Sequence, residues 1–177
     1  MARKKDPEES RIPRRRLASV SARVKDVSPG AFLRLGPEAP RGFWAREGRW
    51  FAHLGAVGVV DVTDPGEGGN RFQLVWTEAL SQLEEQAPDL ESEVPPPPPR
   101  FFGGFAFRDG HLPGEAWAGF PAAHFILPEV ELMGREGKGT LTCRGALGPD
   151  EDLEACRRRL QEPVSYTHLT LPTKRIV

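Results

Sequence analysis

Cysteine, net charge and long hydrophobic runs are all scarce in this chain. The two cysteines among its 177 residues, Cys143 and Cys156, lack the CxxC spacing or neighbouring histidine of a zinc or redox site, so we expect reduced, structural thiols. A formal net charge of −1 gives no overall field to attract nucleic acid or an anionic membrane. No apolar run approaches the ~18 residues that span a bilayer, and no secretory signal is recognisable. The sequence therefore predicts a cytoplasmic protein without nucleic-acid or membrane partners.

Tyrosine is also scarce, and the one tyrosine, Tyr166, lies in a C-terminal segment unlike the rest of the chain. The residues from Val164 to Thr173 match, without a gap, one reading frame of the transposase adapter used in shotgun sequencing. Segments of such origin are set aside before a fold is considered. We expect residues 163–177 to be derived from the adapter and the natural sequence to stop near Glu162; an ordinary polar tail is the alternative.

The remaining sequence is long enough for one domain. Residues 1–16 are basic but include acidic side chains, and we expect a disordered leader. Residues 17–162 form the predicted domain. Within it, residues 87–100 pass from acidic side chains into the run from Pro95 to Pro99, which favours an extended polyproline segment. We interpret 87–100 as a spacer loop that does not pack, in preference to a ligand for an SH3-type domain.

Short β-rich runs separated by glycine and proline dominate the domain. A helix is predicted over 71–86, where Phe72, Val75, Trp76, Ala79, Leu80 and Leu83 form one apolar stripe. Acidic residues at the start and arginines at the end predict a second helix over 150–160. Strands are predicted at 17–24, 32–35, 42–47, 50–54 with a continuation through 55–61, 101–107, 125–132 with an interruption at Pro128, and 139–144.

Few side chains suggest chemistry. His53, His111 and His124 are dispersed, with no carboxylate at a fixed spacing, which is a poor pattern for a metal site or a catalytic triad. Glu129 and Glu131 alternate on one strand face; we interpret them as a solvent-facing stripe in preference to an acid–base pair. Phe101, Phe105 and Phe107 would share a face and require a core.

Four short words carry a family resemblance: Leu54-Gly-Ala-Val-Gly58, Phe102-Gly-Gly-Phe-Ala-Phe107, Trp117-Ala-Gly-Phe-Pro121 and Leu127-Pro128. Together with the order of the elements, they resemble the N-terminal part of the isochorismate synthases, which are chorismate-utilising enzymes. The resemblance implies an α+β fold of antiparallel β-sheets with flanking helices, similar to component I of anthranilate synthase. It also implies conversion of chorismate to isochorismate with Mg²⁺, for menaquinone or siderophore biosynthesis.

In that family the catalytic lysine and the glutamates belong to the C-terminal half. No residue of this chain therefore inherits a catalytic, cofactor-binding or metal-binding role, and we expect the fragment by itself to be inactive. One alternative is component I of an anthranilate or aminodeoxychorismate synthase. The tryptophan-binding LLES motif of those enzymes has only Leu90-Glu-Ser92 as a counterpart, within the 87–100 spacer loop. Another is a non-catalytic binding or scaffold module. The sequence leaves the oligomeric state open.

Overall fold

The computed structural model describes residues 16–63, 69–83, 90, 92–107, 119–147, 151–152 and 154–161. The leader except for Arg16, the adapter-like segment 163–177 and His111 lie outside these residues. The domain boundaries therefore stay predictions.

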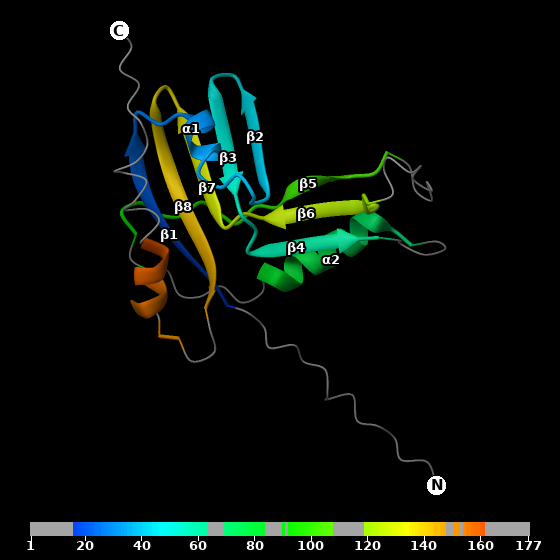
Figure 1. Cartoon of the computed structure of the whole chain (residues 1–177). Helices are drawn as coiled ribbons and strands as arrows, with labels where there is room; N and C mark the ends of the chain where they lie inside the picture. Colours follow the sequence, from blue (N-terminus) through cyan, green and yellow to red (C-terminus); the bar gives the residue numbers. More distant parts are fainter. Residues whose placement is uncertain are drawn as a thin grey trace.

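Two antiparallel sheets, which we call sheet A and sheet B, form the frame of the molecule (Figure 1). Sheet A has the strand order β1 (Arg16–Lys25), β8 (Lys138–Leu147), β7 (Val130–Arg135), β3 (Arg49–Leu54) and β2 (Arg41–Arg46). Sheet B has the order β4 (Gly58–Val62), β6 (Ala123–Leu127) and β5 (Phe102–Phe105). Antiparallel sheets with a few helices confirm the predicted α+β class.

Two tight hairpins organise sheet A. The turn between β2 and β3 has positive φ at Glu47 and Gly48, and the turn between β7 and β8 has positive φ at Glu136 and Gly137. Two consecutive positive φ values match the right-handed twist of the flanking strands, and glycine adopts them without steric cost. The strands on both sides of each turn were predicted from the sequence, and they are confirmed.

At two junctions between consecutive strands the chain passes from one sheet to the other. At Gly55, φ is +67°, and the chain leaves β3 to form β4 in sheet B, so the predicted continuation of one strand through 55–61 is wrong. At Pro128 the chain leaves β6 and enters β7 in sheet A, as the predicted interruption suggested. Both junctions use residues that disturb a strand ladder, since proline has no N–H and glycine tolerates positive φ.

Residues 32–35, predicted as a strand, instead include the end of a short helix, α1 (Pro29–Leu33). The Ser28 hydroxyl accepts a hydrogen bond from the Ala31 amide at 3.4 Å, and Pro29 occupies the first turn, where its missing N–H is harmless. Phe32 is almost fully buried. A hydrophobic run this short does not distinguish helix from strand, which is why the sequence prediction failed.

Helix α2 (Arg71–Leu83) confirms the predicted helix as far as Leu83. The side-chain oxygen of Asn70 accepts hydrogen bonds from the Phe72 and Gln73 amides and caps its first turn. Arg71 and Val75 are buried, whereas Phe72, Trp76 and Leu80 are exposed, so only one edge of the predicted stripe contacts the sheet. A further helix at 154–161 confirms the predicted C-terminal helix, with the Asp152 carboxylate accepting from the Ala155 amide at 2.6 Å.

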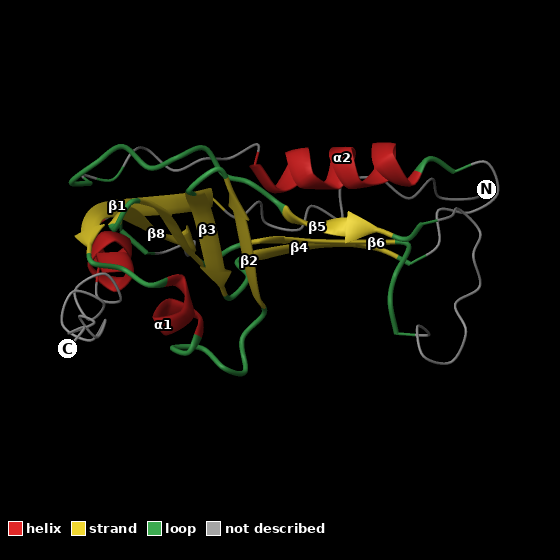
Figure 2. Cartoon of the chain, turned by 90° about the horizontal axis from the view of Figure 1, so that it is seen from above, coloured by secondary structure: helices red, strands yellow, loops and turns green. Residues whose placement is uncertain are grey.

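Each sheet has its own hydrophobic core. On sheet A, the inward side chains of β1, β3, β7 and β8 pack with Phe32 of α1 and with Cys156 and Leu160 of the last helix. On sheet B, Val60, Val62 and Ala123 pack with Val75 of α2. Figure 2 shows α1 and helix 154–161 on one side of sheet A and α2 on one face of sheet B. Phe107, expected in a core, is 95% exposed because β5 ends at Phe105.

The predicted spacer at 87–100 packs against sheet A wherever it is described. The hydroxyl of Ser92 accepts from the Ser21 amide and the carboxylate of Glu93 from the Arg23 amide, both at 3.2 Å, and Leu90 is buried in the core. These two amides lie on β1, the edge strand of sheet A. An edge strand needs acceptors for its free N–H groups, and the segment supplies them. The expectation that these residues do not pack is therefore wrong.

Among the described residues, none of the helices is long and apolar enough to cross a membrane.

Candidate functional site

The face of sheet A opposite its hydrophobic core carries a set of polar and basic side chains. Because the five strands are in register, residues two apart on each strand form parallel rows across the sheet. One row contains Ser21, Thr142, Glu131 and His53, and all four are buried. The segment 92–100 lies over this face, so these polar groups are covered and need partners within the protein.

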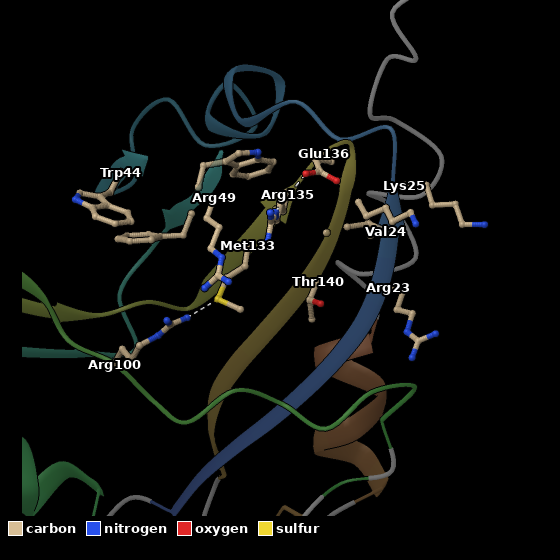
Figure 3. Close-up of a pocket in the computed structure, with 15 residues that line it drawn as sticks. Arg23, Val24, Lys25, Trp44, Arg49, Arg100, Met133, Arg135, Glu136 and Thr140 are labelled. Carbon is tan, nitrogen blue, oxygen red and sulfur yellow. Dashed lines mark hydrogen bonds and ion pairs between the residues drawn. The ribbon is translucent and has the colours of Figure 1, made fainter. Parts of the chain in front are cut away.

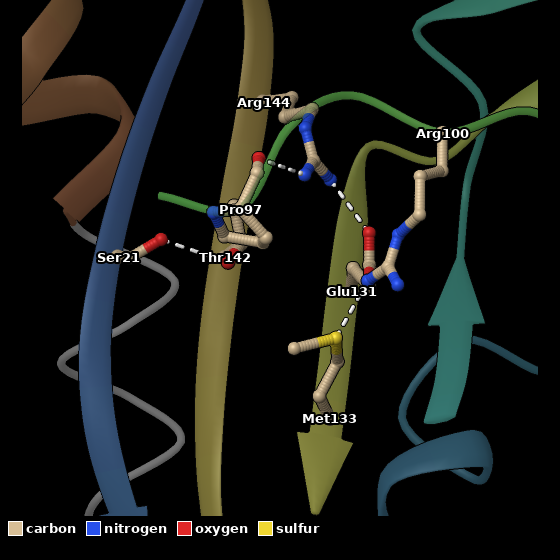
Figure 4. Close-up of polar contacts among 7 residues, drawn as sticks. All are labelled: Ser21, Pro97, Arg100, Glu131, Met133, Thr142 and Arg144. Carbon is tan, nitrogen blue, oxygen red and sulfur yellow. Dashed lines mark hydrogen bonds and ion pairs between the residues drawn. The ribbon is translucent and has the colours of Figure 1, made fainter. Parts of the chain in front are cut away.

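Glu131 and Arg144 form a fully buried ion pair, with 2.9 Å between Arg144 Nη1 and Glu131 Oε2 (Figure 4). Arg100 contacts the second carboxylate oxygen, and Arg144 also donates to the Pro97 carbonyl at 3.2 Å. Burial lowers the pKa of Arg144, and the charge of Glu131 opposes that effect. Since both oxygens of Glu131 are occupied, this carboxylate ties segment 92–100 to the sheet and is not placed for acid–base work.

The predicted solvent-facing stripe of Glu129 and Glu131 is therefore half wrong. Glu129 is exposed, just before β7, whereas Glu131 is completely buried. The sequence pattern could not reveal this difference, because segment 92–100, which covers Glu131, lies about 30 positions earlier in the chain.

His53 is held between two close neighbours. Its ring stacks on Phe102 with 5.1 Å between centroids, and it lies against Gly42, where an added Cβ would come within 2.4 Å of the ring nitrogen Nε2. Its Nδ1 is buried and has no hydrogen-bond partner in the described structure. Burial lowers the pKa of His53, an effect that the nearby Glu131 partly offsets. His53 is therefore a neutral packing residue near pH 7.

His124 lies on sheet B and pairs with Asp61 of β4, with 2.6 Å between Nδ1 and the carboxylate oxygen; both side chains are about half exposed. The two described histidines thus belong to different sheets. Within the described residues, no three His, Cys, Asp or Glu side chains are grouped so that they could hold a metal ion. These residues therefore do not fit a magnesium site, and we assign none of them to one.

The two cysteines are free and buried, as the sequence predicted. Burial raises the pKa of the Cys143 thiol to about 12, and burial likewise raises that of Cys156. A thiol with a raised pKa is a poor nucleophile at neutral pH. Both cysteines are structural members of the sheet A core.

A row of five basic residues crosses the hairpin end of the polar face. Each strand contributes one member, and the pairing register places neighbours directly opposite one another: Lys25, Lys138, Arg135, Arg49 and Arg46. We call this set the basic row. Like charges directly opposite one another destabilise a sheet. Arg46 and Arg135 have exposed ion pairs with the turn residues Glu47 and Glu136, while the described residues give the other three no acidic partner.

The basic row borders an open hollow with a volume of about 960 Å³ (Figure 3). Trp44 and Phe51 form an aromatic wall, with their rings stacked at 5.4 Å between centroids. Arg100, fixed by Glu131, enters from the covering segment, and one lining residue, Glu136, is acidic. The remaining lining residues are Arg23, Val24, Lys25, Arg49, Trp50, Met133, Gly134, Arg135, Lys138, Gly139 and Thr140.

This hollow was not predicted from the sequence, although a signal was present. The turns of the two hairpins share one motif, a Glu-Gly pair between two basic residues: Arg46-Glu-Gly-Arg49 and Arg135-Glu-Gly-Lys138. In a hairpin with a two-residue turn, the two basic residues on either side of the Glu-Gly pair lie opposite each other. Only the pairing of β3 with β7, which places Arg49 opposite Arg135, shows that the two motifs lie side by side.

Comparison with known proteins places the fold in a family. The model of the family described as chorismate binding enzyme matches residues 3–174, which is nearly the whole chain. The matched range includes residues 163–174, and the boundary near residue 162 stays a prediction. No curated protein is significantly similar to the chain. Because the match covers far more than half of the sequence, the chain belongs to the family of chorismate-binding enzymes.

Proposed function

We propose that this chain is the N-terminal part of an isochorismate synthase, with chorismate as its substrate. The family match over residues 3–174 is the observation that carries the proposal. The narrower assignment is supported by the FGGFAF word, which supplies β5 at the edge of sheet B, and by the LP word at the end of β6.

The proposed reaction moves a hydroxyl group on chorismate. Such a reaction needs a base to activate water, an acid to assist the departing hydroxyl and a cation to hold a substrate carboxylate. The described residues do not gather these groups: Glu131 is occupied by two arginines, and no metal-binding cluster occurs among them. We therefore propose that the acid, the base and the magnesium ligands are contributed by sequence beyond residue 162, and that this chain contributes the frame.

The test begins with the source DNA, sequenced across the codon for Pro163. The continued reading frame, expressed and supplied with chorismate and Mg²⁺, is expected to yield isochorismate, detected by chromatography. Anthranilate or aminodeoxychorismate formed in the presence of ammonia would instead identify component I of a sister synthase. If the genome encodes residues 163–177 followed by a stop codon, and this chain does not bind chorismate, the enzyme assignment is wrong and a non-catalytic module takes its place.

A further inference from the structure

β2 is the outermost strand of sheet A on the side away from β1, and no described strand continues the sheet beyond it (Figure 1). The opposite edge is covered, because Ser92 and Glu93 accept hydrogen bonds from two amides of β1. Natural sheet edges are otherwise blunted by proline, by a bulge or by charged side chains within the strand. β2 pairs with β3 without a bulge, and its central residues, from Gly42 to Ala45, include neither proline nor a charged side chain. A regular, open edge of this kind can pair with another strand.

The pairing of β2 with β3 shows which backbone groups of this edge are free. In an antiparallel pair, alternate residues exchange both hydrogen bonds with the neighbouring strand, and the residues between them direct their N–H and C=O groups away from it. The Gly55 amide donates to the Pro40 carbonyl at 2.8 Å, so the even-numbered residues of β2 are those that bond to β3. The N–H and C=O groups of Arg41, Phe43 and Ala45 therefore point outward.

This outward set is complementary to itself. Two antiparallel copies of β2, related by a twofold axis at Phe43, place Arg41 opposite the partner's Ala45 and Phe43 opposite the partner's Phe43. All the outward groups are then paired, with about six hydrogen bonds between the copies. Arg41 faces a small neutral side chain, so no two cations are directly opposed along the strand. Trp44 lies beside the partner's Gly42, an arrangement in which an aromatic ring covers the glycine of an edge strand.

The exposed side chains of β2 fit the same register. Phe43 and Trp44 are 52% and 48% exposed, and the Trp44 ring is held in place by its stack on Phe51. The basic row ends at Arg46, which the register places opposite the partner's Pro40. The two basic rows therefore do not meet across the axis, and their charge does not oppose the pairing.

We infer that β2 is a homodimerisation edge, through which two copies of this chain join their A sheets into one continuous antiparallel sheet about an axis at Phe43. The contact involves a strand of 6 residues from each copy, so it is small, weak and dependent on protein concentration. It uses none of the acid, base or metal groups of the proposed hydroxyl transfer.

The test is disulfide cross-linking of the full chain, with one variant that carries Arg41→Cys and another that carries Ala45→Cys. In the proposed register, the two introduced thiols lie opposite each other with about 5.5 Å between their Cα atoms, which a disulfide can bridge. Two copies of the same variant place these thiols about 13 Å apart, which a disulfide cannot bridge. After mild oxidation, we expect an equimolar mixture to give at least about tenfold more cross-linked dimer on a non-reducing gel than either variant alone. The native Cys143 and Cys156 are buried and common to every sample.

A third substitution tests the edge itself. Phe43→Pro, added to both cysteine variants, removes the outward N–H at the axis and should lower the yield of the mixture by about fivefold or more. An edge strand tolerates proline where the N–H faces solvent, so the single chain should remain folded. Trp76→Gln, added to both cysteine variants, is the matched control, because Trp76 is an exposed aromatic residue of α2, which packs on sheet B (Figure 2). It should leave the yield unchanged.

The proposal is overturned if the mixture gives no more cross-linked dimer than the separate variants. It is also overturned if either variant alone gives as much as the mixture, which would indicate another register or an unspecific contact. A yield that is lost with Trp76→Gln and kept with Phe43→Pro would place the contact on α2. The comparison of the mixture with its separate variants decides the proposal even where Phe43→Pro lowers the melting temperature, and none of these outcomes depends on chorismate turnover.

Discussion

Glu131 and Arg144 show at the scale of single residues how the covering segment is fastened. The pair is completely buried, and the removal of one partner leaves the other as an uncompensated charge. We expect Glu131→Leu to lower the free energy of unfolding, measured in urea, by about 3–5 kcal/mol. The double variant Glu131→Leu with Arg144→Met should lose less than Glu131→Leu alone, because it leaves no buried charge without a partner. A double variant whose loss equals the sum of the two single losses would contradict this coupling.

Two adjacent glycines of β5 provide a second comparison at the same scale. A Cβ on Gly103 would lie 1.9 Å from the backbone oxygen of His124, whereas a Cβ on Gly104 would meet nothing within 4 Å. We expect Gly103→Ala to destabilise the protein by about 1–3 kcal/mol, because β5 would have to move away from β6. Gly104→Ala should be neutral or stabilising by up to about 1 kcal/mol. Equal unfolding free energies for the two variants would show that β5 and β6 are not this close.

At the scale of elements, His53 reports on the packing of β5 against sheet A. Phe102 of β5 covers its ring, and burial lowers its pKa below the ordinary value of 6.5. On acidification, the unfolded chain therefore takes up the proton first, and the folded protein loses stability as the pH falls below about 6.5. The contribution of His53 is complete above that pH.

We expect His53→Gln to flatten the dependence of the unfolding free energy on pH between about 7 and 5. His124→Gln is the matched control, because the His124 side chain is half exposed and contacts Asp61 of β4 instead of sheet A. A steep acid dependence that persists unchanged in His53→Gln would assign the loss to other groups. Urea unfolding at several pH values measures both variants.

At the scale of the whole molecule, α2 carries apolar side chains that sheet B leaves largely exposed, although Phe72 still contacts Phe105 of β5. Phe72, Trp76 and Leu80 recur at helical spacing and are about half exposed or more, with Trp76 at 66%. A contiguous apolar face of this kind promotes association between copies. We expect Trp76→Gln to reduce concentration-dependent self-association, measured by sedimentation velocity, and to leave the unfolding free energy within about 0.5 kcal/mol.

Trp76→Phe keeps the surface apolar and should retain the association of the parent chain. If Trp76→Gln associates as strongly as the parent, the contact lies elsewhere, with the outer edge of β5 as the next candidate.

Local structure follows from short stretches of the sequence alone. Arg46-Glu-Gly-Arg49 specified one hairpin through its turn chemistry, and the spacing of Val75 and Ala79 specified α2, because both signals act within a few residues. Other features arise only in the assembled fold: residues 50–61 divide between two sheets, Glu131 is buried under a segment expected to be a free spacer, and the two hairpin turns bring their basic residues into one row. Each of these depends on contacts between residues far apart in the chain, and the free energy of such contacts arises from burial and pairing that no local pattern records.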